Sequence, residues 1–392
     1  MREGSGTVAG LLERRSGRRG VMVAAASVVV VLGAAAGTLT AYGDGGDDGP
    51  RGAGRPHPKA SASLVVPASA PPPSPSVSAS ASVPAARPKP SPGRTARVPR
   101  AAAGSTGLYR HPDSQVLDWV RANPGDPRTA VIESEIASRP AAVWFTEYDP
   151  ETVTSRVRAV TSGAAAQGRV PVLVAYAIPD RDCGGASEGG APDLDAYAGW
   201  IDAFAAGLGR GEAVVVLEPD SVAQTDCLDA AVRAARLAAL ARAGRVLKGA
   251  DPRARVYYDA GHSAWNSPAA QAALLRQAGA ASAASSDGIF SNVSNFHRTA
   301  DEVAYDRRVL DALGGPPGLG AVIDTSRNGN GAPADGEWCD PDGRSIGSAP
   351  TFRTGQDRID AYLWVKLPGE SDGCKGAAGE FSPSYAYELA SS

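Results

Sequence analysis

Short hydrophobic runs alternate with longer, alanine-rich segments of helical periodicity from about residue 105 to the end of the chain. Helices are predicted over residues 194–208, 228–247, 268–283 and 300–313. Seven of the hydrophobic runs predict strands, which begin at Ala141, Val170, Ala213, Arg255, Gly288, Gly320 and Ala361. Alternating strands and helices are typical of a parallel sheet with right-handed crossovers. The pattern therefore predicts an α/β domain whose seven units close into a parallel (β/α) barrel.

An open, doubly wound sheet is the alternative arrangement of such units. That fold binds dinucleotides through a glycine-rich turn that directly follows a strand. The spacing Gly207-Leu208-Gly209 follows a predicted helix instead, so it is a weak match to this motif. The barrel is the favoured prediction.

The stretch AVVVLEPDS, residues 213–221, shows most clearly how a strand ends. Its aliphatic residues 214–217 fit a strand that is buried on both faces. Glu218, Pro219 and Asp220 cannot continue such a strand, so the chain leaves the sheet there. In a barrel the carboxyl-terminal ends of the strands carry the catalytic groups. The acids that follow each strand are therefore candidate site residues.

The segment before the predicted domain has three parts of different composition. Residues 1–20 are basic, and residues 21–43 carry no charge, which indicates a signal peptide or a transmembrane anchor. Residues 44–104 are rich in Pro, Ser and Ala and predict a disordered linker. The folded domain is expected over residues 105–392, outside the cytoplasm, either secreted or tethered to the outer face of the membrane.

The net charge bears on nucleic-acid binding, and the cysteines bear on the choice between disulfides and a zinc site. The formal net charge of −3 leaves no basic footprint for a nucleic-acid partner. The chain has four cysteines and no CxxC pair. In an oxidising compartment these favour two disulfides over a zinc site, and sequential pairing would join Cys183 to Cys227 and Cys339 to Cys374.

The groups that follow the predicted strands are mostly acids. Metal hydrolysis through histidine ligands is not indicated, because the four histidines form no HxH or HExxH motif. A carboxylate-only Mg²⁺ or Ca²⁺ site stays open, as does a nucleophile at Ser263, although Trp265 replaces the second glycine of a nucleophile elbow. The strand-end groups are Glu147, Asp149, Asp180, Arg181, Asp182, Glu218, Asp220, Asp259, His262, Asp324, Arg327, Lys366, Glu370 and Asp372.

Clustered carboxyls beside cations and tryptophans point to glycoside hydrolysis. That reaction needs one carboxyl that keeps its proton and a second group that acts as base or nucleophile. A neighbouring carboxylate raises the pKa of the proton donor. Trp144, Trp265 and Trp338 lie beside strand-end loops, where they can stack on sugars or pack in the core. Trp119, Trp200 and Trp364 lie within periodic runs and are expected in the core.

Six motifs together resemble glycoside hydrolase family 6. They are PDRDC (179–183), LEPDS (217–221), DAGHSAW (259–265), SNVSNF (291–296), EWCD (337–340) and LWVKLPGESDG (363–373). They occur in the family's order and cover the chain from about Gly107 onward. The resemblance implies a distorted, TIM-like barrel of seven strands and an inverting cellulase that cuts β-1,4-glucan. It implies no cofactor and no metal.

The resemblance also implies roles for individual residues. Asp220 matches the general acid, Asp182 the carboxylate that raises the pKa of this acid, and Asp372 the proposed base, acting directly or through a water chain. Tyr176 matches the tyrosine beside the distorted sugar. Substrate contacts are implied for Trp144, Ser187, Asp259, His262, Trp265, Asn295, Trp338, Lys366 and Glu370. The pairs Cys183–Cys227 and Cys339–Cys374 match the family's two disulfides.

Two departures from the family favour an open cleft and internal cleavage. Only 20 residues follow Asp372, too few for a long loop over the cleft in addition to the last helix. Pro268 replaces an outer stacking tryptophan. We therefore expect a monomeric endo-β-1,4-glucanase. A cellobiohydrolase and a catalytically silent glucan-binding protein of the cell surface are the alternatives.

Overall fold

The computed structural model describes residues 107–392. The predictions for residues 1–20, 21–43 and 44–104 lie outside the described residues. Among residues 107–392, no helix is both long enough and apolar enough to cross a membrane.

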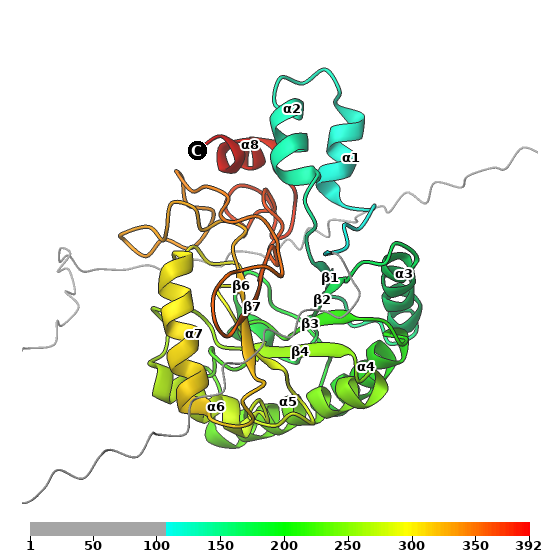
Figure 1. Cartoon of the computed structure of the whole chain (residues 1–392), viewed down its shortest axis with the longest axis vertical. Helices are drawn as coiled ribbons and strands as arrows, with labels where there is room; N and C mark the ends of the chain where they lie inside the picture. Colours follow the sequence, from blue (N-terminus) through cyan, green and yellow to red (C-terminus); the bar gives the residue numbers. More distant parts are fainter. Residues whose placement is uncertain (1–106) are drawn as a thin grey trace, which may run out of the picture. The chain divides into compact units, whose positions relative to one another are not determined.

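The central element is a parallel sheet of seven strands in the order β1 to β7 (Figure 1). Strands that follow one another in the chain are neighbours in the sheet, which is the order of a barrel. All seven predicted strands are confirmed, and so is the distorted, TIM-like fold. The strands are β1 (Val143–Phe145), β2 (Val172–Ala175), β3 (Ala213–Leu217), β4 (Ala254–Asp259), β5 (Gly288–Ser291), β6 (Gly320–Asp324) and β7 (Ile359–Leu363).

The sheet does not close through a strand pair between β1 and β7 within the described residues. Two hydrogen bonds join this seam instead. The backbone N–H of Ala142 donates to the carbonyl of Trp364 at 2.9 Å, and the indole Nε1 of Trp144 donates to the carbonyl of Val365 at 2.7 Å. The predicted closed barrel is therefore a curled sheet whose first and last strands are joined only loosely.

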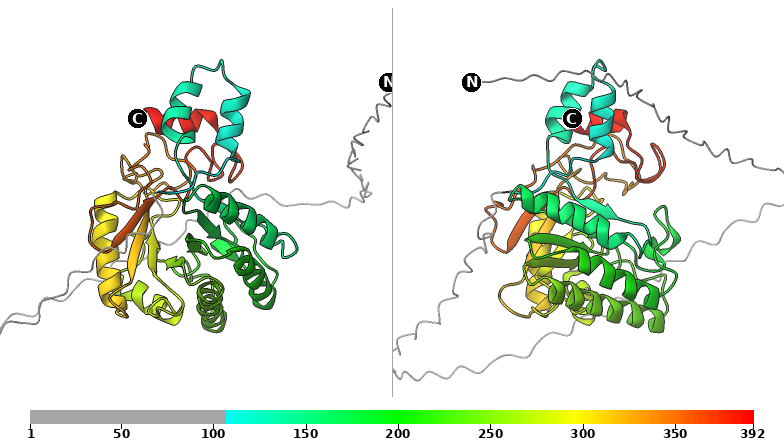
Figure 2. Two further views of the ribbon diagram at one scale, coloured as in Figure 1. Left: turned by 45° about the vertical axis from the view of Figure 1, so that its right-hand side comes forward. Right: turned by 90° about the vertical axis from the view of Figure 1, so that its right-hand side faces the viewer.

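Helices cover the outer face of the sheet (Figures 1 and 2). They are α3 (Val153–Ala166), α4 (Leu194–Gly207), α5 (Ala230–Ala250), α6 (Pro268–Gln277) and α7 (Thr299–Leu313). The four predicted helices are confirmed as α4 to α7, whereas α3 was not predicted, and the helix predicted over 268–283 ends at Gln277. Gly279 takes a φ of +85°, and the N–H of Ala280 turns back to the carbonyl of Leu275. A left-handed glycine with such a bond ends a helix.

Side chains from alternate positions of each strand form two hydrophobic cores. In β3, Val214 and Val216 face the inside of the barrel, whereas Val215 and Leu217 face the helices. All five residues of this strand are buried, as its aliphatic run predicts. Trp200 packs in the outer core and is fully buried, which confirms its expected place.

A third, smaller core joins the two ends of the described chain. It contains Trp364, which is 2% exposed, and half-buried Trp119, whose ring lies 6.1 Å from that of Phe381. Its helices are α1 (Gln115–Ala122), α2 (Thr129–Ile132), the π-helical turn η1 (Glu133–Ala137) and α8 (Pro383–Ser391), which lie together at one end of the molecule in Figure 2. The sequence pattern did not predict these helices.

Two disulfides join loops on the cleft side of the sheet. They are Cys183–Cys227 and Cys339–Cys374, so the sequential pairing is confirmed. The first follows Asp182 directly, at the 3₁₀ turn η2 (Arg181–Gly184), and the second follows Asp372 by two residues. Both crosslinks therefore lie next to predicted catalytic carboxylates.

Candidate active site

A cleft of about 1520 Å³ runs along the carboxyl-terminal ends of the strands. Loops that follow each of the seven strands contribute to its walls. All predicted site residues line it except Asp259. These are Trp144, Tyr176, Asp182, Ser187, Asp220, His262, Trp265, Asn295, Trp338, Lys366, Glu370 and Asp372.

Strand β3 delivers Asp220 to this cleft through a strained turn. Glu218 and Asp220 have φ values of 51° and 68°, in the left-handed region that residues other than glycine rarely adopt. Hydrogen bonds hold the turn, from Ser221 Oγ to the carbonyl of Glu218 at 2.6 Å and from Gln224 N to the carbonyl of Asp220 at 2.8 Å.

The surroundings of Asp220 favour the protonated form of its carboxyl. Burial is the main cause that raises its pKa well above the ordinary value, and the charges of Asp259 and Asp182 raise it further. A carboxyl that retains its proton at neutral pH can donate it to a leaving group. The predicted general acid therefore has the electrostatic environment that its role requires.

Asp182 begins a chain of hydrogen bonds that passes through Ser187 to Tyr176. Its Oδ2 accepts from Ser187 N at 2.8 Å and from Ser187 Oγ at 2.9 Å. Ser187 Oγ lies 2.9 Å from the hydroxyl of Tyr176, at the end of β2. The three residues thus connect the loop that carries Ser187 to the wall beside Asp220.

Asp372 is held between two cations. Its Oδ2 accepts from Nη1 of Arg327 at 2.7 Å, and its Oδ1 lies 3.1 Å from Nζ of Lys366. The Arg327 side chain is fully buried, and its guanidinium lies 4.4 Å from the ring centre of Phe296. The two cations balance the negative charge of the Asp372 carboxylate and fix its orientation.

The aromatic residues of the cleft differ in how much they are exposed. Trp338 is 58% exposed, whereas Trp144 and Trp265 are half-buried. Trp144 packs edge-on against Tyr176, with ring centres 5.4 Å apart. Trp265 lies beside His262 at 5.2 Å. These rings give the cleft apolar faces of the kind that pack on sugar rings.

Three polar residues that line the cleft, His262, Glu370 and Asn295, differ in their neighbours. The ring of His262 stacks on that of His297 at 4.1 Å, and burial, with the charge of His297, lowers the pKa of His262 to about 3. Burial raises the pKa of Glu370 to about 7, although Lys366 and a hydrogen bond from Gln115 oppose this. Asn295 lines the cleft, and its side-chain amide donates to the carbonyl of Val293 at 3.0 Å.

Asp259 lies behind the cleft wall rather than on it. It is 2% exposed, and its carboxylate accepts backbone N–H groups from Val222, Ala223 and Gly261 at 3.0, 2.8 and 2.8 Å. Its predicted contact with the substrate is therefore corrected. Asp259 holds the segment that follows the Asp220 turn, and its charge raises the pKa of Asp220.

Two more buried acids bind the ends of neighbouring strands in the same way. Glu218 accepts the N–H groups of Ala177 and Ile178, which follow β2. Asp324 accepts those of Val365 and Lys366, which follow β7. Several acids of the strand ends therefore join loops together instead of facing the cleft.

Within residues 107–392, no three His, Cys, Asp or Glu side chains come together as a metal site would require. Two groups that surround Asp372 were not predicted as part of the site. Arg327 follows β6 and was noted there only as a strand-end cation. Asp340 was visible only as the neighbour of Cys339 in the EWCD motif.

Comparison with known proteins gives consistent matches. The family model described as glycosyl hydrolases family 6 matches residues 106–391. Endoglucanase 1 of a Streptomyces species is 54% identical over 297 residues, which are 76% of this chain and 81% of that protein. Endoglucanase A of Thermobispora bispora is 49% identical over 74% of this chain and 63% of its own length. This chain thus spans just under two thirds of the Thermobispora protein.

Among solved structures, the endoglucanase Cel6 from Mycobacterium tuberculosis, bound to methyl-cellobiosyl-4-deoxy-4-thio-β-D-cellobioside, superposes with a TM-score of 0.67. Its sequence is 39% identical, and the match covers 74% of this chain and 97% of that one.

Proposed function

Because the chain belongs to the glycosyl hydrolases of family 6, we propose that it is an endo-β-1,4-glucanase that cleaves internal bonds of cellulose-type glucans with inversion. The observation that carries the proposal is the pairing of two unlike carboxyls in one cleft. Burial and neighbouring carboxylates raise the pKa of Asp220 and so favour its protonated form, whereas Asp372 is bound by two cations. Inverting glycosidases need such a pair.

On the leaving-group side, Asp220 donates its proton to the glycosidic oxygen as the bond to the anomeric carbon breaks. Because the carboxylate that remains lies near Asp259 and Asp182, it is disfavoured and readily takes up a new proton. Asp182 also binds Ser187, whose Oγ lies 2.9 Å from the hydroxyl of Tyr176, the side chain that we expect beside the sugar at the cleavage point.

On the opposite face of the sugar, a water molecule attacks the anomeric carbon. Asp372 takes up the proton of this water, directly or through a second water. The carboxyls of Asp220 and Asp372 are then expected to stand about 6.5–9.5 Å apart or further, which leaves room for the attacking water. The cleft's aromatic faces at Trp144, Trp265 and Trp338 hold the neighbouring glucose units.

Internal cleavage is favoured over exo action. The relatives that are at least 42% identical are named endoglucanases, whereas those named exoglucanases are 30% identical or less. On carboxymethylcellulose, an endoglucanase lowers viscosity early relative to the reducing ends that it releases. Slow viscosity loss with steady release of cellobiose would support a cellobiohydrolase instead.

The decisive test of activity and mechanism is the anomeric form of the product. Proton NMR of freshly cleaved cellopentaose should show the α-anomer first, followed by slow mutarotation. The β-anomer as first product would refute inversion. No cleavage, with glucan binding retained, would support the silent glucan-binding protein.

We also propose that the enzyme acts outside the cytoplasm. The two disulfides, Cys183–Cys227 and Cys339–Cys374, support this, since such bonds persist in oxidising compartments. Cell fractionation with antibodies to the domain would separate secreted from membrane-tethered protein. Recovery in the cytoplasm would refute the proposal.

A further inference from the structure

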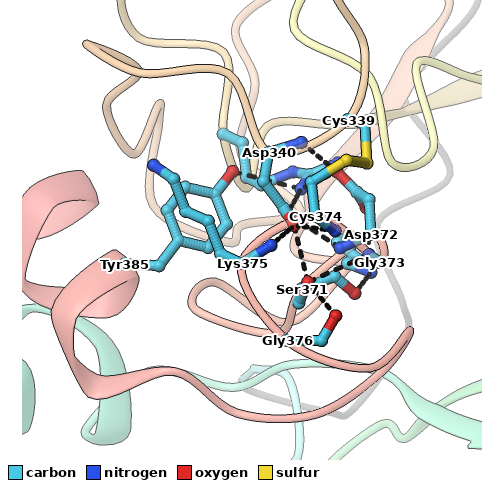
Figure 3. The surroundings of a disulfide bond; sticks show 11 residues. Cys339, Asp340, Ser371, Asp372, Gly373, Cys374, Lys375, Gly376 and Tyr385 are labelled. Carbon is cyan, nitrogen blue, oxygen red and sulfur yellow. Dashed lines mark hydrogen bonds and ion pairs between the residues drawn. A yellow bond between two sulfur atoms is a disulfide. The ribbon is translucent and has the colours of Figure 1, made fainter.

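Two segments meet beside Asp372, as Figure 3 shows. One contains Cys339 and Asp340, from the long connection between β6 and β7. The other is the stretch 371–375 that follows β7. The disulfide Cys339–Cys374 joins them. Asp340, next to this disulfide, also joins the two segments through several hydrogen bonds.

The Asp340 carboxylate accepts four hydrogen bonds from the second segment. Its Oδ1 accepts the backbone N–H of Asp372 at 2.7 Å. Its Oδ2 accepts from Ser371 Oγ at 2.5 Å, from Cys374 N at 3.0 Å and from Lys375 N at 2.9 Å. In return, the backbone N–H of Asp340 donates to Oδ2 of Asp372 at 3.2 Å. Asp340 therefore binds both the backbone and the carboxylate of Asp372.

The surroundings of Asp340 shield these bonds from solvent and keep its carboxylate charged. The residue is 3% exposed, and its φ of 48° lies in the left-handed region. Burial by itself would raise the pKa of Asp340, but the hydrogen bonds from Ser371, Lys375, Asp372 and Cys374 lower it to about 2. The carboxylate is thus charged wherever the protein is folded at ordinary pH.

We propose that Asp340 is a positioning residue for the catalytic carboxylate Asp372. Arg327 and Lys366 attract Asp372 from two sides, and the Asp340 bonds set where between these cations its carboxylate rests. The disulfide does not do this alone. It fixes Cys374, and Gly373, with a φ of 124°, separates that residue from Asp372. The inference rests on the proposed function of the cleft.

The test compares Asp340→Asn with Asp342→Asn. In Asp340→Asn the shape is kept, but the new amide N–H₂ faces backbone N–H groups of the second segment and repels them. Asp342 is the matched control, because its side chain is 90% exposed and pairs only with Lys375 among the ion pairs of the described chain. Turnover, KM, affinity for a thio-linked cello-oligosaccharide and amide hydrogen exchange are measured for both variants and the unsubstituted chain.

We expect kcat of Asp340→Asn to fall about 100-fold, since a displacement of about 1 Å in a catalytic group costs this much. Affinity for the thio-oligosaccharide should stay within about threefold, because ground-state contacts are kept. Added azide should restore part of the rate, since it attacks the anomeric carbon without a base and yields an α-glucosyl azide. Amide exchange at Asp372, Cys374 and Lys375 should quicken by about tenfold or more. Asp342→Asn should show none of these changes.

A kcat of Asp340→Asn close to that of Asp342→Asn would overturn the proposal. So would equal losses of kcat and ligand affinity with no azide rescue, because they would indicate general misfolding. The exchange measurement separates failure of the Asp340 proposal from failure of the proposed glucanase function. If the unsubstituted chain does not cleave glucans, unchanged exchange at Asp372 still overturns the link to Asp340, and faster exchange supports it.

Discussion

Replacing Glu218 by glutamine tests whether the acid next to the proton donor serves the fold rather than the reaction. Glu218 is fully buried, and its carboxylate accepts the N–H groups of Ala177 and Ile178 at 2.9 and 3.0 Å. Burial raises its pKa to about 7, because these two backbone bonds offset only part of the desolvation. Glutamine keeps the acceptor and the size of the side chain but carries no charge.

The expected change in unfolding free energy follows from the linkage between proton binding at Glu218 and folding. The pKa of Glu218 rises from an ordinary value of 4.5 to about 7, a difference of about 2.5 units. At 1.36 kcal/mol per unit this is about 3 kcal/mol of unfolding free energy. Because the folded-state pKa is the higher one, this stability is present below pH 4.5 and is lost as the pH rises through 7. Glu218→Gln removes this loss.

Urea unfolding between about pH 5 and pH 8 measures the effect. The unfolding free energy of Glu218→Gln, taken relative to the unsubstituted chain, should increase by up to about 3 kcal/mol across this range. Glu147→Gln is the control, since that side chain is 75% exposed. Parallel pH curves for the two substitutions would refute the reasoning. Loss of activity in Glu218→Gln as large as in a substitution of Asp220 would show that Glu218 takes part in catalysis.

Three further predictions concern the cleft. Asp220→Ala should lower turnover on cellulose by about 10²–10⁴-fold or more, with glucan binding kept in a pull-down assay; retained activity would refute the acid assignment. Asp259→Asn removes a charge that raises the pKa of Asp220, so the alkaline limb of the kcat/KM profile should move to lower pH, and an unmoved limb would contradict the coupling. Trp338→Ala should weaken binding of cello-oligosaccharides by about 1 kcal/mol in calorimetry, with kcat changed less than KM; unchanged affinity would remove Trp338 from the substrate path.

The fold was predictable from the sequence where hydrophobic runs are continuous. Strand β3 has five buried residues in a row, and a run of this kind has few alternatives in an α/β domain. The helices α1 and α2 were not predicted, because they are short and their apolar residues pack on Trp364, which is distant in the sequence. Their stability is a tertiary effect that a local pattern does not contain.

The proposed catalytic pair, Asp220 and Asp372, was predicted from motifs, but its surroundings were not. The cation Arg327 and the acid Asp340 come from loops whose paths depend on the disulfide Cys339–Cys374 and on left-handed backbone conformations. Neither feature has a periodic signal in the sequence. The pairing of Asp372 with two cations is therefore visible only once the loops are placed.

The acids at the strand ends divide into two groups for a physical reason. Asp182, Asp220 and Asp372 lie in loops beyond the strand ends and line the cleft. Where the side chain stays under the loops, as at Glu218, Asp259 and Asp324, it meets the free N–H groups that neighbouring strands leave as they end, and it accepts them. Strand ends thus require buried acceptors whether or not a reaction takes place there. A run of aliphatic residues followed by an acid consequently indicates the edge of the sheet that carries the cleft, while the backbone N–H groups within reach of each carboxylate determine which acids are held behind its wall.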